Sequence, residues 1–174
     1  MPAGHLAVID MQRVFADPDG PWATPGFAAI VPTVAALVEA FEPAVTRTRF
    51  VAPAEPVGAW VDYYEQWPFA RQPPSAALWD VVPPLAGFSL DATTFGKWGP
   101  QLSARVGAGP LVLAGVSTDC CVLSTALAAA DAGVQVLVVA DACAGVSPAA
   151  HQRALDAMAL YEPLIRVVTS SSVT

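Results

Sequence analysis

Short runs of continuously apolar residues recur along the chain, separated by longer segments with apolar residues at helical spacing. The runs His5–Ile9 and Val134–Ala140, and the run LVLA that ends at Gly115, do not alternate with polar residues, which is typical of parallel strands buried on both faces. The segments Ala28–Phe41 and Pro148–Leu160 carry an apolar residue every three or four positions, which predicts amphipathic helices. Further strands are predicted at Ala44–Phe50, around Phe88–Leu90 and at Leu164–Val168, and further helices over Pro100–Val106 and about Cys121–Ala132.

Strands that alternate with helices in this order predict a parallel, doubly wound sheet with right-handed crossovers. A chain of 174 residues is long enough for one domain with a sizeable core, so residues 1–174 are assigned to a single domain. Sheets of this kind bind ligands at the carboxyl ends of their strands. Gly115 is not part of a GxGxxG pattern, which disfavours a dinucleotide cofactor.

The segment Val51–Pro84 does not fit this alternation. It is rich in proline and tryptophan and contains Tyr63 and Tyr64, and Gly58–Gln66 is expected to form one or two turns of helix. Long aromatic loops in compact domains are usually functional. Two roles are open for this one, the wall of a pocket or a contact between subunits, because aromatic residues are enriched at interfaces.

The composition excludes several classes of protein. With 55 % apolar and 13 % charged residues the chain is too apolar to be disordered, and it has no apolar run of about 20 residues that could span a membrane. A net charge of −7 argues against nucleic acid or an anionic membrane surface as partners. Three cysteines, two of them adjacent, do not suit a disulfide framework, and no secretory signal opens the chain. We therefore expect a cytoplasmic protein.

Four residues that could take part in catalysis follow predicted strands or lie where predicted helices begin. Asp10 closes the first strand, Lys97 lies before the helix over Pro100–Val106, and Cys120 and Cys121 stand where a later helix begins. Lys97 is the only lysine among 8 basic residues, so a compact ammonium has been kept at this one position. Each residue also has a plain structural interpretation: a turn-forming aspartate, a surface lysine, and small buried thiols.

A thiol in the first turn of a helix is favoured as the thiolate, because it lies beside unpaired N–H groups and the positive end of the helix dipole. The same N–H groups can stabilise an oxyanion. Cys143, in the loop-like segment DACAG, has no basic neighbour and is interpreted as structural. The histidines, His5 and His151, show no zinc-binding spacing, so no metal and no cofactor are expected.

IDMQ near the N-terminus and GVSTDCCVLSTALAAADAGVQVLVVADACAG in the second half resemble the isochorismatase-like cysteine hydrolases, which include nicotinamidases, N-carbamoylsarcosine amidohydrolases and isochorismatases. The resemblance runs from about His5 to the last strand and implies a three-layer α/β/α sandwich. It implies that Cys121, directly before valine, is the nucleophile and that Asp10 is the catalytic carboxylate. It also implies a cis peptide bond after Val116 and an oxyanion hole formed by the N–H groups of Ser117 and Cys121.

Two positions depart from the family pattern. If TTF at Thr93–Phe95 matches the family's S-A-F pattern, the family lysine falls on Ser89, and we expect Lys97 to supply the ammonium instead. The region after the second strand has no histidine, unlike the Asp/His cluster of nicotinamidases, which disfavours nicotinamidase activity and a metal. Isochorismatases of this family work without the cysteine, so the resemblance implies that Cys121 favours amide chemistry over vinyl-ether hydrolysis.

These observations predict a cysteine hydrolase that cleaves an amide-type C–N bond of a small molecule through a thioester. Phe15, Trp22 and Trp98 are expected to line an apolar pocket for an uncharged or planar substrate. The alternatives are a hydrolase of a non-amide substrate, and a non-catalytic binding protein or thiol redox sensor that uses the adjacent cysteines. Related proteins are often dimers or tetramers, so a homo-oligomer is expected.

Overall fold

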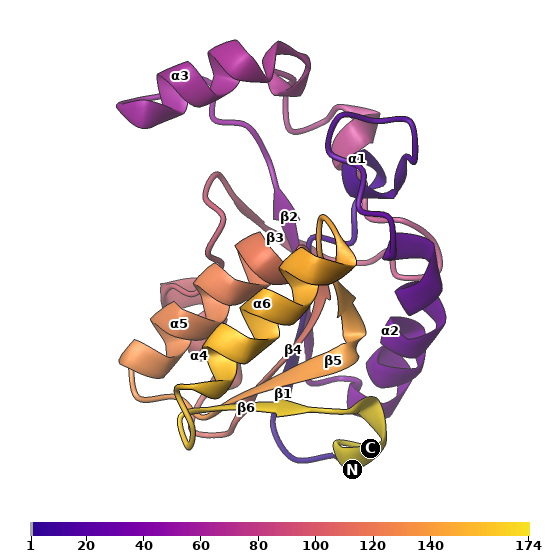
Figure 1. The fold of residues 1–174 in the computed structure, drawn as a ribbon, viewed down its shortest axis with the longest axis vertical. Coiled ribbons are helices and arrows are strands. Elements are labelled where there is room, and N and C mark those ends of the chain that lie inside the picture. Colours follow the sequence, from indigo (N-terminus) through magenta and orange to yellow (C-terminus); the bar gives the residue numbers. More distant parts are fainter. Residues whose placement is uncertain (1) are drawn as a thin grey trace.

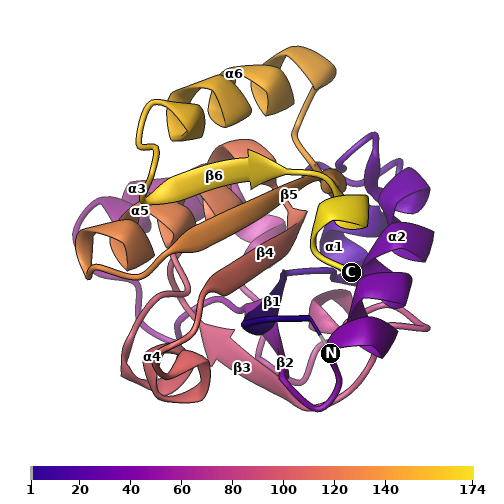
Figure 2. The same ribbon diagram turned by 90° about the horizontal axis from the view of Figure 1, so that it is seen from below.

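A six-stranded sheet forms the centre of the computed structural model, which describes residues 2–174 (Figures 1 and 2). All five strand pairings are parallel, and the strand order is β3-β2-β1-β4-β5-β6. The predicted doubly wound α/β/α fold is therefore confirmed. The strands are β1 (His5–Ile9), β2 (Val45–Phe50), β3 (Ser89–Ala92), β4 (Leu111–Val116), β5 (Val136–Ala144) and β6 (Ile165–Val168).

Helices cover both faces of the sheet. Figure 2 shows α2 on one side and α4, α5 and α6 on the other, and each side has its own apolar core. The two central strands, β1 and β4, are almost completely buried between these layers, which explains their unbroken apolar sequences. The helices are α1 (Arg13–Ala16), α2 (Phe27–Phe41), α3 (Ala59–Gln66), α4 (Pro100–Val106), α5 (Leu123–Asp131) and α6 (Pro148–Ala159).

The ends of β1 and β4 approach each other very closely. Gly115 pairs with Ile9 and has a φ of 119°, and a Cβ built on it would lie 2.1 Å from the Ile9 carbonyl oxygen. Only glycine fits such a contact and such a backbone conformation. The residues that follow, Asp10 on one strand and Ser117 on the other, therefore leave the sheet side by side at its carboxyl edge.

Two local structures differ from the sequence-based expectation. The chain after β4 first makes a wide π-type turn over Thr118–Val122 and enters α5 only at Leu123, so Cys121 precedes the regular helix. Cys143 lies inside β5 and not in a loop, because β5 resumes pairing with the end of β4 after an irregularity near Gly115. The predicted structural role of Cys143 fits this buried strand position.

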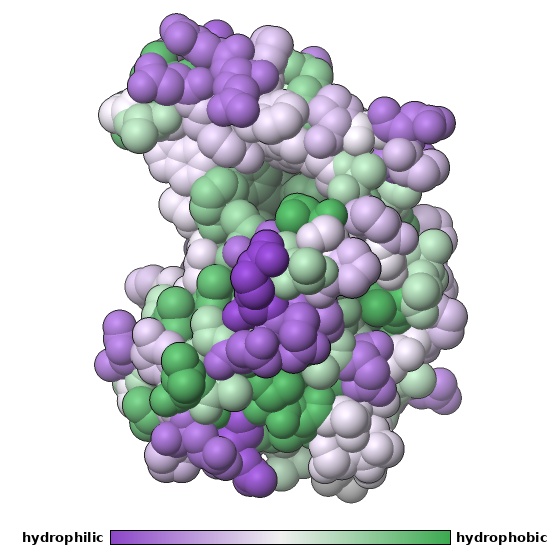
Figure 3. All heavy atoms as spheres, viewed as in Figure 1, coloured by the Kyte–Doolittle hydropathy of each residue, from purple (hydrophilic) through white to green (hydrophobic). Residues whose placement is uncertain are grey.

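The segment that carries α3 stands apart from the sheet layers. In Figure 1 it lies beyond the carboxyl ends of the strands, and Figure 3 shows that the surface is hollowed beneath it, with apolar residues around the hollow. A third apolar cluster joins this segment to β2 and the α1 region. Among residues 2–174, no helix combines the length and the apolar character needed to cross a membrane.

Candidate active site

A buried ion pair lies at the carboxyl edge of the sheet. The Nζ atom of Lys97 is 2.9 Å from the Oδ2 atom of Asp10, and the two side chains are 1 % and 0 % exposed. The two residues are far apart in sequence, and the loop after β3 brings the lysine over the end of β1. Because removing either charge would leave the other buried and unpaired, this contact is highly constrained.

A threonine on the neighbouring strand holds Asp10 in an unusual conformation. Asp10 has a φ of 47°, the only positive φ at a non-glycine residue in the described part of the chain. The hydroxyl of Thr48 donates to Asp10 Oδ1 at 2.7 Å and accepts from the Asp10 N–H at 3.2 Å. One buried hydroxyl thus fixes both the backbone and the carboxylate, and leaves Oδ2 to face the lysine.

Lys97 is held both at its backbone and at the tip of its side chain. Its backbone N–H donates to the Thr125 hydroxyl at 2.9 Å, and that hydroxyl donates to the Cys121 carbonyl at 2.6 Å. Its Nζ donates to the Thr94 carbonyl at 2.7 Å and lies 5.1 Å from the ring centroid of Phe50. A single threonine hydroxyl therefore couples the lysine loop to the turn that carries the candidate nucleophile.

Cys120, Cys121 and Ser117 line a cavity of about 420 Å³ at this edge of the sheet. Cys121 is 4 % exposed and Cys120 is partly exposed. The peptide bond between Val116 and Ser117 is cis. In the turn that follows, the Ser117 carbonyl accepts hydrogen bonds from the N–H groups of Cys120 and Val122, but not from the N–H group of Cys121. Ser117 thus stands directly before this turn and Cys121 lies within it, so the two N–H groups of the expected oxyanion hole belong to one short segment.

The two adjacent thiols have opposite pKa shifts. A hydrogen bond from Cys121 lowers the pKa of Cys120, and it outweighs the effect of burial. The same hydrogen bond, followed by burial and the charge of Asp10, raises the pKa of Cys121, while Lys97 opposes the rise. The pKa of Cys121 is therefore shifted in the direction opposite to that expected for a thiol at the start of a helix. A raised pKa favours the thiol form, and the charge of Asp10 is one of its causes.

These shifts predict the order in which the three cysteines react with iodoacetamide near neutral pH. Cys120 should be alkylated first, because it is partly exposed and its lowered pKa increases the thiolate fraction. Cys121 should follow, and Cys143 should react last, because burial raises its pKa to about 12. Peptide mapping by mass spectrometry at increasing reaction times gives the order. Alkylation of Cys143 before Cys121 would contradict the burial described here.

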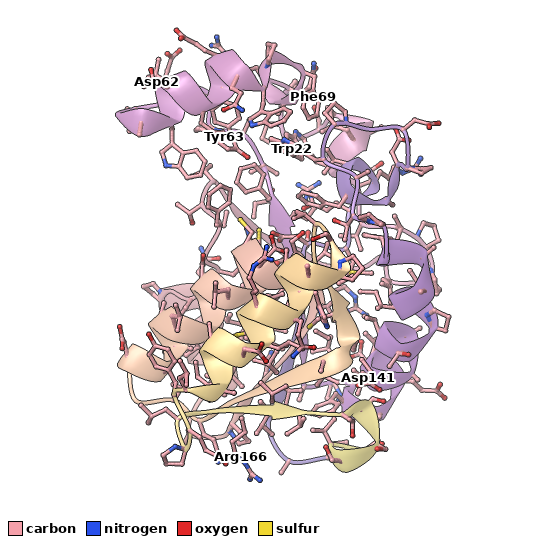
Figure 4. The ribbon with its side chains drawn as sticks, in the orientation of Figure 1. Trp22, Asp62, Tyr63, Phe69, Asp141 and Arg166 are labelled. Atoms are coloured by element: carbon pink, nitrogen blue, oxygen red, sulfur yellow. The ribbon has the colours of Figure 1, made fainter. Side chains whose placement is uncertain are left out.

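Aromatic residues from four parts of the chain form the walls of the cavity. Phe15 and Trp22 come from the α1 region, Tyr63 and Trp67 from the α3 segment, and Phe50 and Phe95 from the ends of β2 and the loop after β3. The expected positions of Phe15 and Trp22 therefore agree with the structure, and the Val51–Pro84 segment forms part of the pocket wall. In Figure 4, Tyr63 and Trp22 lie beneath α3, on its side toward the sheet.

Trp98 does not line this cavity, contrary to the expectation from sequence. It lies against a separate groove on the outer side of the Lys97 loop, next to α4, and packs on the core beneath that helix. Successive side chains of an extended segment point in opposite directions. Because Lys97 points to Asp10, Trp98 turns to the other side of the loop, where it packs next to α4.

Sequence reasoning missed three supporting residues. Thr48 and Thr125 make the contacts described above, and the fully buried side chain of Gln12 bonds to the backbone of both Phe50 and Trp79. Gln12 belongs to the IDMQ motif, and Thr48 points to the same face of its strand as Thr46. Polar residues at positions expected to be buried could have indicated these roles, because buried polar groups need hydrogen-bond partners.

Residues 5–172 match the family model of the isochorismatase domain. The chain belongs to the isochorismatase family. Members of this family are hydrolases and include amidases. None of the curated proteins matches this isochorismatase-family chain.

Solved structures share the fold of this isochorismatase-family protein over nearly its whole length. A cysteine hydrolase from Pseudomonas syringae has a TM-score of 0.83 at 21 % identity, covering 97 % of this chain and 89 % of its own. An isochorismatase family protein from Desulfovibrio vulgaris has a TM-score of 0.83 at 22 % identity, covering 99 % and 96 %. A nicotinamidase/pyrazinamidase from Bacillus subtilis has a TM-score of 0.75 at 22 % identity, covering 94 % and 98 %. At these identities the likeness establishes the fold.

Proposed function

We propose that the protein hydrolyses a small-molecule amide, with Cys121 as the nucleophile and a thioester as the intermediate. The observation that carries this proposal is the buried Asp10–Lys97 pair beside a thiol at the floor of a cavity. A carboxylate, an ammonium and a thiol in one water-poor site are the groups that nucleophilic acyl transfer requires.

In the first half of the reaction, Asp10 accepts the proton of the Cys121 thiol as the sulfur forms a bond to the carbonyl carbon. The carbonyl electron pair moves to the oxygen, where the N–H groups of Ser117 and Cys121 stabilise the negative charge. Asp10 then donates the proton to the amide nitrogen as the C–N bond breaks, and ammonia or an amine leaves. The ammonium of Lys97 balances the negative charge of the Asp10 carboxylate while the site is closed to water.

In the second half, water attacks the thioester carbon and Asp10 accepts a proton from it. The C–S bond breaks, the carboxylic acid product leaves, and the sulfur is reprotonated. Each step uses the same carboxylate in alternating acid and base roles. This explains why Asp10 is held in one geometry by Thr48.

A panel of primary amides with detection of released ammonia tests this function. The panel should include nicotinamide and pyrazinamide, the compounds named for the Bacillus subtilis neighbour. Wild-type protein is expected to release ammonia from at least one amide. Cleavage of an ester or vinyl ether without ammonia release from any amide would assign the site to non-amide hydrolysis and overturn the proposal.

Thiol redox sensing is the second candidate, because two adjacent thiols line one cavity and Cys120 has a lowered pKa. Adjacent cysteines rarely form a disulfide, since the geometry strains the intervening peptide. This candidate predicts reversible oxidation at low peroxide together with no hydrolysis. The cytoplasmic location and the homo-oligomeric state expected from the sequence stay predictions.

Substitution of Thr48 gives a sharper test of how Asp10 acts. Thr48→Val should lower kcat about tenfold with little change in KM, because the carboxylate loses the donor that orients it. Thr48→Ser should restore most of the rate. The measurements are steady-state kinetics on a hydrolysed amide and thermal unfolding.

Thr46→Val is a matched control for Thr48→Val. Thr46 lies two residues earlier on the same strand, is equally buried, and bonds to His5 Nε2 at 2.7 Å, away from the cavity. It should lower stability by about as much as Thr48→Val, about 1–2 kcal/mol, without lowering kcat. Equal loss of kcat in both variants would show that Thr48 has only a structural role.

A further inference from the structure

The turn over Thr118–Val122 is bonded to the start of α6 and to the loop before it. Thr118, the first residue of the turn, is 0 % exposed, and its Oγ1 atom lies 2.8 Å from Nδ1 of His151 on α6. The next residue, Asp119, accepts through Oδ1 from the N–H of Val146 at 3.0 Å. Two consecutive residues of the turn are therefore held by one short segment of the chain.

A close approach of the backbones accompanies these two bonds. A Cβ atom built on Gly145 would lie 2.6 Å from Oδ1 of Asp119 and 2.9 Å from the backbone nitrogen of His151. A side chain at position 145 would therefore push the turn and α6 apart, and glycine allows them to meet.

The start of α6 is itself held in place. Pro148 is its first residue, and the hydroxyl of Ser147 caps the helix by accepting from the N–H of Ala150 at 3.1 Å. The N–H of His151 donates to the Ser147 carbonyl at 2.9 Å. In Figure 1 this end of α6 lies toward the carboxyl ends of the strands. The imidazole of His151 thus projects from a capped helix start at the edge of the sheet where the candidate site lies.

His151 is uncharged in its contact with Thr118. Burial lowers the pKa of His151, although the charge of Asp119 opposes this shift. The imidazole is therefore neutral near pH 7, and Nδ1 accepts from the Thr118 hydroxyl or donates to it, depending on the tautomer. His151 is not among the residues that line the cavity, so its contact is with the turn and not with a substrate.

Thr118 connects this hydrogen bond to the candidate catalytic groups. It directly follows Ser117 and lies three residues before Cys121. Both of these residues line the cavity, and their N–H groups form the expected oxyanion hole. Attack on a carbonyl depends on the exact positions of the sulfur and of these donors. A small displacement of the turn should therefore slow the reaction more than it weakens binding.

We propose that His151 is a positioning residue for the reaction: through its hydrogen bond with Thr118 it holds the turn that presents Cys121 and the two N–H groups of the oxyanion hole. This inference rests on the proposed amide hydrolysis and adds a residue of α6 to that site. His151 acts through Thr118 and does not touch the reacting atoms.

Substitution of His151 by leucine and by asparagine tests this hydrogen bond. The oxygen and nitrogen of an asparagine amide are attached to Cγ, as Nδ1 is in histidine, so the amide can accept or donate at about the same place. His151→Leu should lower kcat on a hydrolysed amide about tenfold with little change in KM. His151→Asn should restore kcat to within about threefold of wild type. Wild-type kcat in His151→Leu, or an equal loss in both variants, would overturn the inference.

Thr118→Val removes the hydrogen bond from its other side. It should also lower kcat about tenfold, and the double variant with His151→Leu should lose no more than either single variant. Losses that multiply in the double variant would show that the two side chains act independently, which would overturn the inference. Thr118→Val alone gives the same kinetic test should His151→Leu not fold.

His5→Leu is a matched control for His151→Leu. The Nε2 atom of His5 also bonds to a buried threonine hydroxyl, that of Thr46 at 2.7 Å, but His5 is the first residue of β1, at the opposite edge of the sheet. This variant should unfold at a lower temperature without a loss of kcat. A loss of kcat as large as that in His151→Leu would show that the rate responds to any buried pair of this kind, and would overturn the inference.

The rate of Cys121 alkylation by iodoacetamide separates this inference from the proposed function, because it requires no hydrolysis. A buried thiol reacts when its surroundings open. In His151→Leu, Cys121 should react about fivefold faster than in wild type, whereas Cys143 in β5 should keep its rate. If wild-type protein hydrolyses no amide but this selective rise is present, the proposed function falls and the positioning of the turn stands. A Cys121 rate that is unchanged, or that rises together with the Cys143 rate, would overturn the inference whatever the activity.

Discussion

Cys121→Ala is expected to lower the proposed amide hydrolysis by about four orders of magnitude or more, while the protein should still fold and bind the amide. The reason is that the acyl group is transferred to this sulfur, and no other group in the proposed mechanism forms a covalent bond to the substrate. The change removes one buried atom from a side chain that is 4 % exposed, so the loss of stability should be about 1 kcal/mol. Ammonia release and thermal unfolding, measured on the same preparation, separate the two effects.

The other two cysteines serve as controls. Cys143→Ala should retain full activity, because Cys143 lies in β5 and does not line the cavity. Cys120→Ala should retain activity within about tenfold, since it removes the hydrogen bond that raises the pKa of Cys121 but leaves the nucleophile. If Cys120→Ala is inactive and Cys121→Ala is active, the motif places the nucleophile at the wrong cysteine.

Lys97→Met has the second largest expected effect, and it acts on stability as well as activity. It leaves the Asp10 carboxylate, which is 0 % exposed, without its counter-ion. Breaking a buried ion pair from one side costs about 3–5 kcal/mol. Activity should fall about a hundredfold or more, because the carboxylate is no longer held in place. Urea unfolding and ammonia release provide the two measurements.

The double variant Asp10→Asn/Lys97→Met tests whether the loss of stability comes from the unpaired charge. It should recover most of the lost stability and stay inactive, because both charges have been removed. Arg13→Met is a surface control. Arg13 pairs with Asp80 at 3.9 Å, and the two side chains are 58 % and 50 % exposed. Its effect on the free energy of unfolding should therefore stay below about 1 kcal/mol. A Lys97→Met protein as stable as wild type would contradict the buried pair.

The centre of the sheet could be predicted from sequence because β1 and β4 are almost entirely apolar. His5–Ile9 coincides with β1, and Pro100–Val106 coincides with α4. The end of β5 could not be found in this way. The polar residue Asp141 interrupts the apolar run, yet the strand continues to Ala144, because β4 offers it further partners after an irregularity.

The residues of the candidate site could be predicted from the sequence better than their arrangement in space. The single lysine and the residue after β1 stand out in the sequence, but only the fold shows that their side chains meet at 2.9 Å. Trp98 was assigned to the pocket because it is next to Lys97, and adjacent residues of an extended segment face opposite sides. Thr48 and Thr125 are undistinguished in sequence, since their roles depend on partners brought close by strand pairing and helix packing.

The separation between the strand ends and the segment above them has an evolutionary consequence. The candidate catalytic groups stand at the ends of β1 and β4 and on the Lys97 loop, whereas two aromatic residues of the cavity wall, Tyr63 and Trp67, belong to the α3 segment. Residues 59–67 could therefore diversify, or be exchanged with the equivalent segment of a relative, and change which molecules enter without disturbing bond cleavage. Changes in this segment could then alter substrate selectivity while the candidate catalytic groups stay in place.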